Sequence, residues 1–143
     1  MASATINNVL KVFGAKPTEQ EQSALAEEVM LMTLSRATAA DTNIKEVEVD
    51  MVRSVLEKKL GKNYSSADIR IAANSEMYEV APLQEYLASA SSKMRSTDKV
   101  QTIQALAEVI NVDGRVNAME IAFFNEVATA LALTPAQIMG LVE

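Results

Sequence analysis

The stretch that decides the fold is written twice, first as Asp41-Thr42-Asn43-Ile44-Lys45-Glu46-Val47-Glu48 and then as Asp113-Gly114-Arg115-Val116-Asn117-Ala118-Met119-Glu120. The two copies begin 72 positions apart, at Asp41 and Asp113. In each copy a β-branched apolar residue follows the aspartate by three positions, a glutamate follows it by seven, and an amphipathic run comes next. The repeat predicts two helix-loop-helix units with an acidic loop in each.

Apolar residues continue the repeat on both sides at the same offset, so the repeat-related segments extend over about 21–61 and 97–133. The matched pairs are Leu31 with Ile103, Leu34 with Leu106, Val49 with Ile121, Val52 with Phe124, and Val55 with Val127. Apolar spacing, capping residues and glycine or proline breaks predict the helices. They are expected over 5–13, from a cap at Thr18 to about 39, from a cap at Asn43 through Val47 to Gly61, from Ser65 or Ser66 through Tyr78, from Pro82 through Leu87, over 98–110 with Ser96 or Thr97 as cap, from Asn117 through Leu131, and after Thr134-Pro135.

Composition favours helices throughout. The chain has 143 residues, of which 49% are hydrophobic but only 4% aromatic, with 3 Pro and 4 Gly. Strands are normally rich in aromatic and β-branched residues, and all-β folds need many turn residues. The prediction is therefore one all-α domain over residues 1–143, with about seven or eight helices in two pseudo-symmetric halves.

Charge and residue types exclude several function classes. The net charge is −6, which disfavours nucleic-acid binding, and no apolar stretch is long enough to predict a membrane span or a signal peptide. We expect a cytoplasmic protein. His and Cys are both absent, so the usual general base, nucleophile and transition-metal ligands are missing and no enzymatic activity is expected. The cluster Lys58, Lys59 and Lys62 is interpreted as a solvated helix end.

The acidic residues of the two stretches are the candidate site. A loop aspartate and a glutamate in the first turn of the next helix can converge on one point, and carboxylate oxygens suit hard cations such as calcium, magnesium or manganese. The candidate metal ligands are Asp41, Glu48, Asp113 and Glu120. A basic protein partner is the other ligand that such an acidic surface predicts.

An EF-hand is not expected, although the second stretch resembles the back half of its loop. If Glu120 occupied the final bidentate position, the first ligand position would fall on Val109 and the third on Asn111. The other copy has Ala37 and Ala39 at these places. An apolar side chain cannot supply a ligand there.

The same residues also have a structural interpretation. Asn43 to Glu46 and Asn117 to Glu120 have the spacing of a capping box, in which the two residues satisfy each other's backbone N–H groups. The alternative function is therefore a protein-interaction or oligomerisation module whose acidic residues only cap helices. In that case a homo-oligomer would form through an apolar helix face.

At these stretches the sequence resembles the TerB-like family, named for a tellurite-resistance protein. The family's alanine-rich helix, followed by Ala-Asp-Gly, an aliphatic residue and an acidic helix start, is matched by Ile110-Asn111-Val112-Asp113-Gly114-Arg115-Val116 and Glu120, and its close by Ala130-Leu131-Ala132-Leu133-Thr134-Pro135-Ala136. In the first copy Thr42 replaces the glycine, while Ile44 and Glu48 are kept. The resemblance covers about residues 21–137. It implies an all-helical, internally repeated domain with a role in bacterial metal or stress response through cation binding and protein partners.

Overall fold

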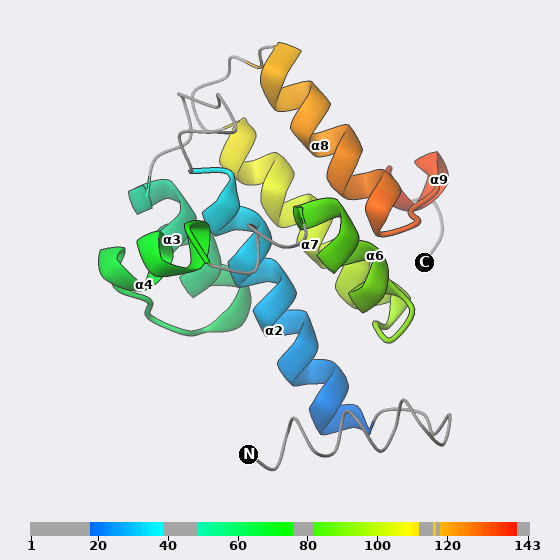
Figure 1. Cartoon of the computed structure of the whole chain (residues 1–143), viewed down its shortest axis with the longest axis horizontal. Helices are drawn as coiled ribbons and strands as arrows, with labels where there is room; N and C mark the ends of the chain where they lie inside the picture. The colour runs from blue at the N-terminus through cyan, green and yellow to red at the C-terminus, as the bar shows by residue number, and fades with distance from the viewer. Residues whose placement is uncertain (1–17, 39–48, 76–81, 112–115, 117, 140–143) are drawn as a thin grey trace.

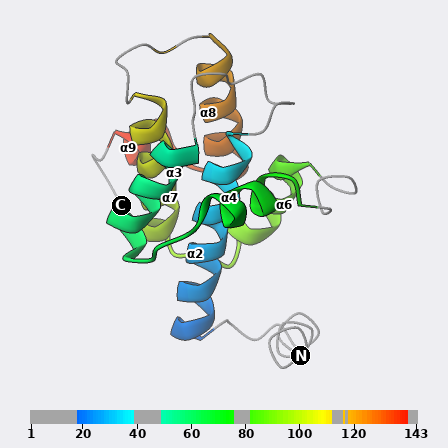
Figure 2. The ribbon, with the colours of Figure 1, turned by 90° about the vertical axis from the view of Figure 1, so that its left-hand side faces the viewer.

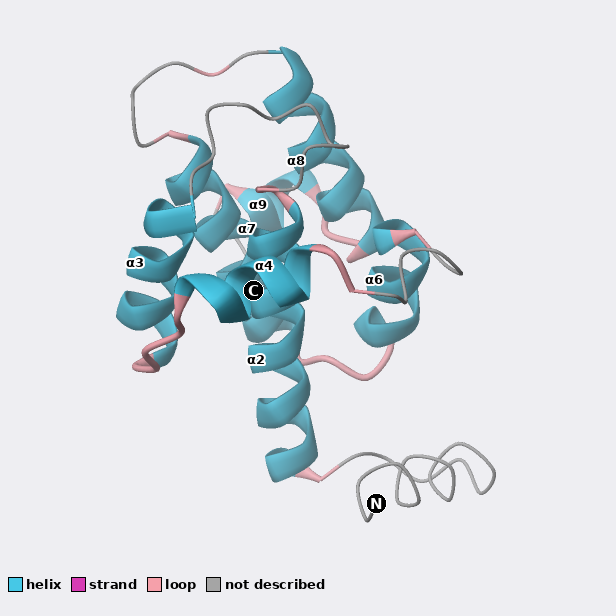
Figure 3. Cartoon of the chain, turned by 60° about the vertical axis from the view of Figure 1, so that its left-hand side comes forward, coloured by secondary structure: helices cyan, strands magenta, loops and turns pink. Residues whose placement is uncertain are grey.

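The computed structural model describes residues 18–38, 49–75, 82–111, 116 and 118–139, and every regular element among them is a helix (Figures 1 and 3). The all-α fold class is thereby confirmed, whereas the pseudo-symmetry of the two halves stays a prediction. The first predicted helix, over 5–13, lies outside the described residues. The described helices are α2 (Glu19–Arg36), α3 (Val49–Leu60), α4 (Ser66–Ala73), α6 (Leu83–Ser91), α7 (Ser96–Ile110), α8 (Ala118–Ala130) and α9 (Pro135–Ile138).

Three helices begin with complete capping boxes, as their sequences predict. Thr18 accepts from the Glu21 N–H at 3.1 Å while the Glu21 carboxylate accepts from the Thr18 N–H at 3.0 Å. Ser65 with Asp68 begins α4 in the same way, and Thr134 with Gln137 begins α9. Each box satisfies two N–H groups that have no partner within the helix. Residues close together in the sequence therefore determine where these three helices begin.

Other helix boundaries differ from the prediction. The second predicted helix ends at Arg36 rather than near 39, and the helix from Ser66 stops at Ala73 instead of running through Tyr78. Helix α7 begins two residues early, with Arg95 in the cap position and without a side-chain cap hydrogen bond. The predicted caps Ser96 and Thr97 are wrong, because the Arg95 guanidinium instead binds the Asp98 carboxylate at 2.7 Å across the first turn.

Helices α2 and α7 form the centre of the molecule. They pack against each other, with α3 and α4 on one side and α6 and α8 on the other (Figures 1 and 2). The short helix α9 packs against α7. Leu34 of α2 and Leu106 of α7, which are equivalent in the repeat, are both fully buried. Burying apolar side chains of this size stabilises the fold by about 1.5–3 kcal/mol each. The two central helices thus supply the shared core.

Ion pairs join helices that are distant in sequence. Lys58 and Lys59, at the end of α3, approach the Glu108 carboxylate of α7 at 3.0 and 3.9 Å. Lys62 contacts Glu27 of α2 at 2.6 Å, and this hydrogen-bonded pairing raises the pKa of Lys62. The lysines lie at and just after the end of α3, and Lys58 and Lys62 are largely exposed, as the interpretation of a solvated helix end requires. Their ion pairs also connect α3 and the following loop to both central helices.

None of the helices in the described part of the chain is long and apolar enough to span a membrane.

Candidate functional site

Glu120 is the one predicted metal ligand that falls within the described residues. It lies in the first turn of α8, and its side chain is 0% exposed. A buried carboxylate is costly unless polar groups contact it, and Glu120 does take part in such an interaction. The positive end of the α8 dipole favours its negative charge as well. The fold therefore holds this carboxylate inside the protein rather than on the solvent-facing side of the helix.

A cavity of about 200 Å³ lies beside Glu120, between the end of α7 and the beginning of α8. Glu120 and Asn111 are the polar residues among its described lining, and the Asn111 side chain donates to the Ala107 carbonyl at 3.0 Å. The remaining described lining is apolar and consists of Ala107, Ile110, Val116, Ile121 and Phe124. A carboxylate on the wall of a small apolar cavity is partly shielded from water, which strengthens its attraction for a cation.

The described helix ends that flank the two acidic loops lie at the same end of the molecule. The last turns of α2 and α7 and the first turns of α3 and α8 are all found there (Figures 1 and 2). Carboxyl ends of helices carry a partial negative charge that favours cations, whereas amino ends favour carboxylates. The carboxyl ends of α2 and α7, which favour cations, therefore lie at the same end of the molecule as the amino ends of α3 and α8, which favour acidic side chains.

The other candidate ligands, Asp41, Glu48 and Asp113, lie outside the described residues, as do Asn43, Glu46 and Asn117 of the proposed capping boxes. Within the described ranges, no group of three or more carboxylates has metal-binding geometry. Convergence of the four acidic residues is therefore still a prediction.

Sequence reasoning missed the outer face of α8. Met119 is 45% exposed and Ile121 is 49% exposed, although the repeat pairs Ile121 with Val49, which is only partly exposed. Val116, just before the helix, is 43% exposed. The sequence of α8 is apolar on nearly all sides, so helical periodicity does not tell its buried face from its exposed one. The only signal available was the scarcity of charged residues in this helix.

Comparison with known proteins gives one match. No curated protein and no solved structure matches the chain at a significant level. A family model described as "Tellurite resistance protein TerB" matches residues 26–141, which is most of the chain and includes both acidic stretches. The chain belongs to the TerB family.

Proposed function

We propose that this TerB-family domain is a non-enzymatic module of a bacterial metal or stress response, in which the acidic residues bind a divalent cation. The ligands would be Asp41, Glu48, Asp113 and Glu120, and their oxygen donors favour calcium, magnesium or manganese. The observation that supports the proposal most directly is the full burial of the Glu120 carboxylate beside a small cavity. A residue that only capped a helix would gain little from such burial, because the capping boxes of α2, α4 and α9 all lie at exposed positions.

The chemistry of the donors fits a cation without a catalytic role. Bound carboxylates and helix carboxyl ends offset the charge of the ion, whereas His and Cys, which most often act as bases or nucleophiles, do not occur in the chain. The cation would link the two helix-loop-helix units at one end of the molecule. Its role would then be to stabilise one arrangement of the acidic loops.

Calorimetric titration with calcium, magnesium, manganese and zinc tests this function. The variants are Asp113→Asn with Glu120→Gln, which keep side-chain size and remove charge, and Glu126→Gln as the matched control. Glu126 lies on the same helix, but it is exposed and accepts from Gln84 at 2.8 Å. We expect saturable binding of a hard cation to the wild type and to the control, and at least about tenfold weaker binding to the double variant. A wild-type chain that binds none of the four ions with saturation refutes the proposal.

The exposed face of α8 supports a second function, docking of a protein partner. Its exposed residues are Ala118, Met119, Ile121, Ala122, Asn125, Glu126 and Thr129, of which only Glu126 is charged. Charged residues are depleted at the centres of protein interfaces. Sedimentation of the wild type and Ile121→Lys at several concentrations tests whether this face joins two copies: a mass that falls in the variant supports self-association, and monomers in both exclude it.

A further inference from the structure

The cavity between the end of α7 and the beginning of α8 opens beside the exposed face of α8. Val116 and Ile121, which are 43% and 49% exposed, line it together with the partly buried Phe124. Its volume of about 200 Å³ exceeds the volume of about 150 Å³ at which an apolar cavity holds a benzene molecule. A side chain with an aliphatic stem therefore fits into it.

Asn111 places a hydrogen-bond acceptor at this cavity. The residue is exposed, and its Nδ2 atom donates to the Ala107 carbonyl oxygen at 3.0 Å. Because a carbonyl oxygen only accepts, the amide nitrogen faces Ala107 and the Oδ1 atom faces away from it. The carboxyl end of α7, where Asn111 lies, also carries a partial negative charge. A donor with a positive charge matches these groups.

Glu120 adds the negative charge of a carboxylate behind the cavity wall. Its side chain is 0% exposed, so it attracts an occupant of the cavity through its electric field rather than through open contact. Charges that are shielded from water attract each other more strongly than exposed charges at the same separation. The cavity therefore favours a ligand that is positively charged at one end and apolar along its length.

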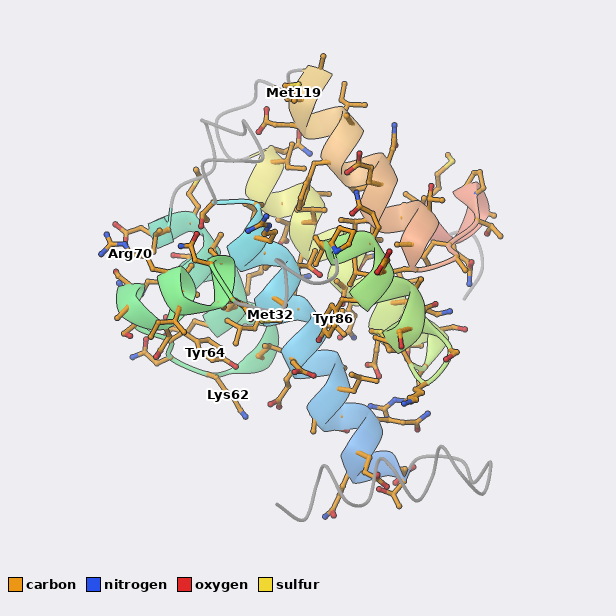
Figure 4. The ribbon with its side chains drawn as sticks, in the orientation of Figure 1. Met32, Lys62, Tyr64, Arg70, Tyr86 and Met119 are labelled. Carbon is orange, nitrogen blue, oxygen red and sulfur yellow. The ribbon has the colours of Figure 1, made fainter. Side chains whose placement is uncertain are left out.

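The basic side chains of neighbouring helices have partners elsewhere. Arg36, in the last turn of α2, donates to the Ala73 carbonyl oxygen of α4 at 2.8 Å, and the lysines at the end of α3 pair with acidic side chains of α2 and α7. Figure 4 shows Lys62 and Arg70 on the α3–α4 side of the molecule, away from Met119 at the start of α8. The described lining of the cavity contains no lysine or arginine.

A lysine side chain combines the two properties that this cavity favours. Its four-carbon stem packs along apolar surface, while its ammonium group donates hydrogen bonds. The exposed face of α8 beside the cavity has Glu126 as its single charged residue, and such a face is suited to the neutral residues around a lysine of a partner. The net charge of −6 favours the approach of a basic partner.

We propose that this cavity receives a lysine side chain of a protein partner that docks on the exposed face of α8. The stem lies against Ile121 and Phe124, and the ammonium group donates to Asn111 Oδ1 within the field of Glu120. This inference rests on the docking function proposed for α8 and does not require a divalent cation. The two can fail separately, because sedimentation reports docking between copies, whereas a lysine peptide reports on the cavity.

Titration of the full chain with a short peptide, followed by NMR in the presence of chelator, tests the proposal. The peptide has blocked ends and one lysine between two leucines, and in a matched peptide norleucine, which lacks the amino group, replaces the lysine. We expect saturable shifts at Asn111 and Ile121, with the lysine peptide binding at least about tenfold more tightly than the norleucine peptide. Equal affinities, or no binding of the lysine peptide, would overturn the proposal.

Two matched pairs of variants test the groups that recognise the lysine. Glu120→Gln should weaken binding at least about threefold, whereas Glu126→Gln, at an exposed position of the same helix, should leave it unchanged. Asn111→Ala should also weaken binding. Its control is Asn74→Ala, because Asn74 ends α4 with the same hydrogen bond, from Nδ2 to the Arg70 carbonyl oxygen at 3.0 Å. Wild-type affinity in folded Glu120→Gln and Asn111→Ala, as checked by circular dichroism, would overturn the proposal.

Two further probes separate other occupants of the cavity. Arg115 precedes Val116 in the chain and lies outside the described residues. If the lysine peptide binds only to Arg115→Ala, the arginine of the chain itself takes this place and the proposal is wrong. n-Butylammonium that binds as tightly as the lysine peptide would also overturn it, because the ligand would then be a free amine rather than a docked partner.

Discussion

Helices α3 and α8 occupy equivalent places in the sequence repeat, yet they use their outer faces differently. Both follow an acidic stretch, and both bury a valine at the same position, Val55 in α3 and Val127 in α8. The outer face of α3 is charged, with Arg53 paired to Asp50 and Lys58 paired to Glu108. The outer face of α8 carries a single charged residue, Glu126.

The repeat preserves the apolar residues at the core positions of the two helices but not the residues at their surface positions. Positions that face the common core keep apolar residues, because a cavity or a buried polar group there would cost several kcal/mol. Surface positions are free to change, since most exposed substitutions alter stability by less than about 0.5 kcal/mol. The charged residues of α3 connect it to α7 within the chain, whereas the neutral surface of α8 is suited to an external partner.

The largest expected effect comes from giving α3 the core residue of α8. Leu56 is fully buried, and its equivalent in the repeat is Ala128. Leu56→Ala should lower the free energy of unfolding by about 2–5 kcal/mol, because neighbouring side chains only partly fill the resulting cavity. Urea denaturation measures the change. A loss below about 1 kcal/mol would show that the α3 side of the core is loosely packed and that the two helices differ in their core as well as on their surface.

Exchanging residues at the two helix ends should change stability in opposite directions. Gly61 after α3 has φ +67°, and Ala132 after α8 has φ +55°. The left-handed region is costly for residues with a Cβ atom, so Gly61→Ala should cost about 1 kcal/mol although no heavy atom lies within 4 Å of the added Cβ. Ala132→Gly should gain about 0.5 kcal/mol after the greater flexibility of glycine in the unfolded chain is allowed for. Thermal unfolding of both variants checks the two signs, and a shift in the same direction would contradict this explanation.

Removing the charged connection of α3 should have a smaller effect. Glu108→Gln removes the negative charge that Lys58 and Lys59 approach and should cost about 0.2–1 kcal/mol, because both lysines remain partly exposed. Urea denaturation at low salt and in 1 M NaCl measures it, and the difference from wild type should shrink at high salt. Glu126→Gln on α8 is the control. A loss that salt leaves unchanged would mean that packing, rather than charge, joins α3 to α7.

The smallest expected effect on stability is at the neutral face of α8. Ile121→Lys should change the free energy of unfolding by less than about 0.5 kcal/mol, because half of the side chain is already in solvent. Denaturation at low protein concentration measures this. A much larger loss would place Ile121 in the core and remove the distinction between the two outer faces.

Local signals in the sequence predicted most of the fold. Thr18, Ser65 and Thr134 form the expected caps because a capping box depends on residues three positions apart. The buried core pairs Leu34 with Leu106 and Val55 with Val127 follow from helical periodicity.

Features that depend on tertiary packing were not predictable in this way. The pairing of Lys58 with Glu108 joins residues 50 positions apart, and the exposure of Ile121 depends on where α7 lies. The burial of Glu120 was also not evident, since a glutamate in a first helical turn is ordinarily exposed. The spacing of the repeat identified this residue as a candidate, but only the packing of α7 against α8 distinguishes it from other acidic helix starts.

The most direct test of the central claim is the free energy of unfolding with saturating divalent cation compared with chelator. At a concentration one hundred times its dissociation constant, a cation that binds only the folded chain should stabilise the wild type by about 2.7 kcal/mol. Glu126→Gln should keep this gain, and Asp113→Asn with Glu120→Gln should lose it. Equal stability of the wild type with calcium, magnesium or manganese and with chelator would contradict the account, and would leave the acidic stretches as helix caps.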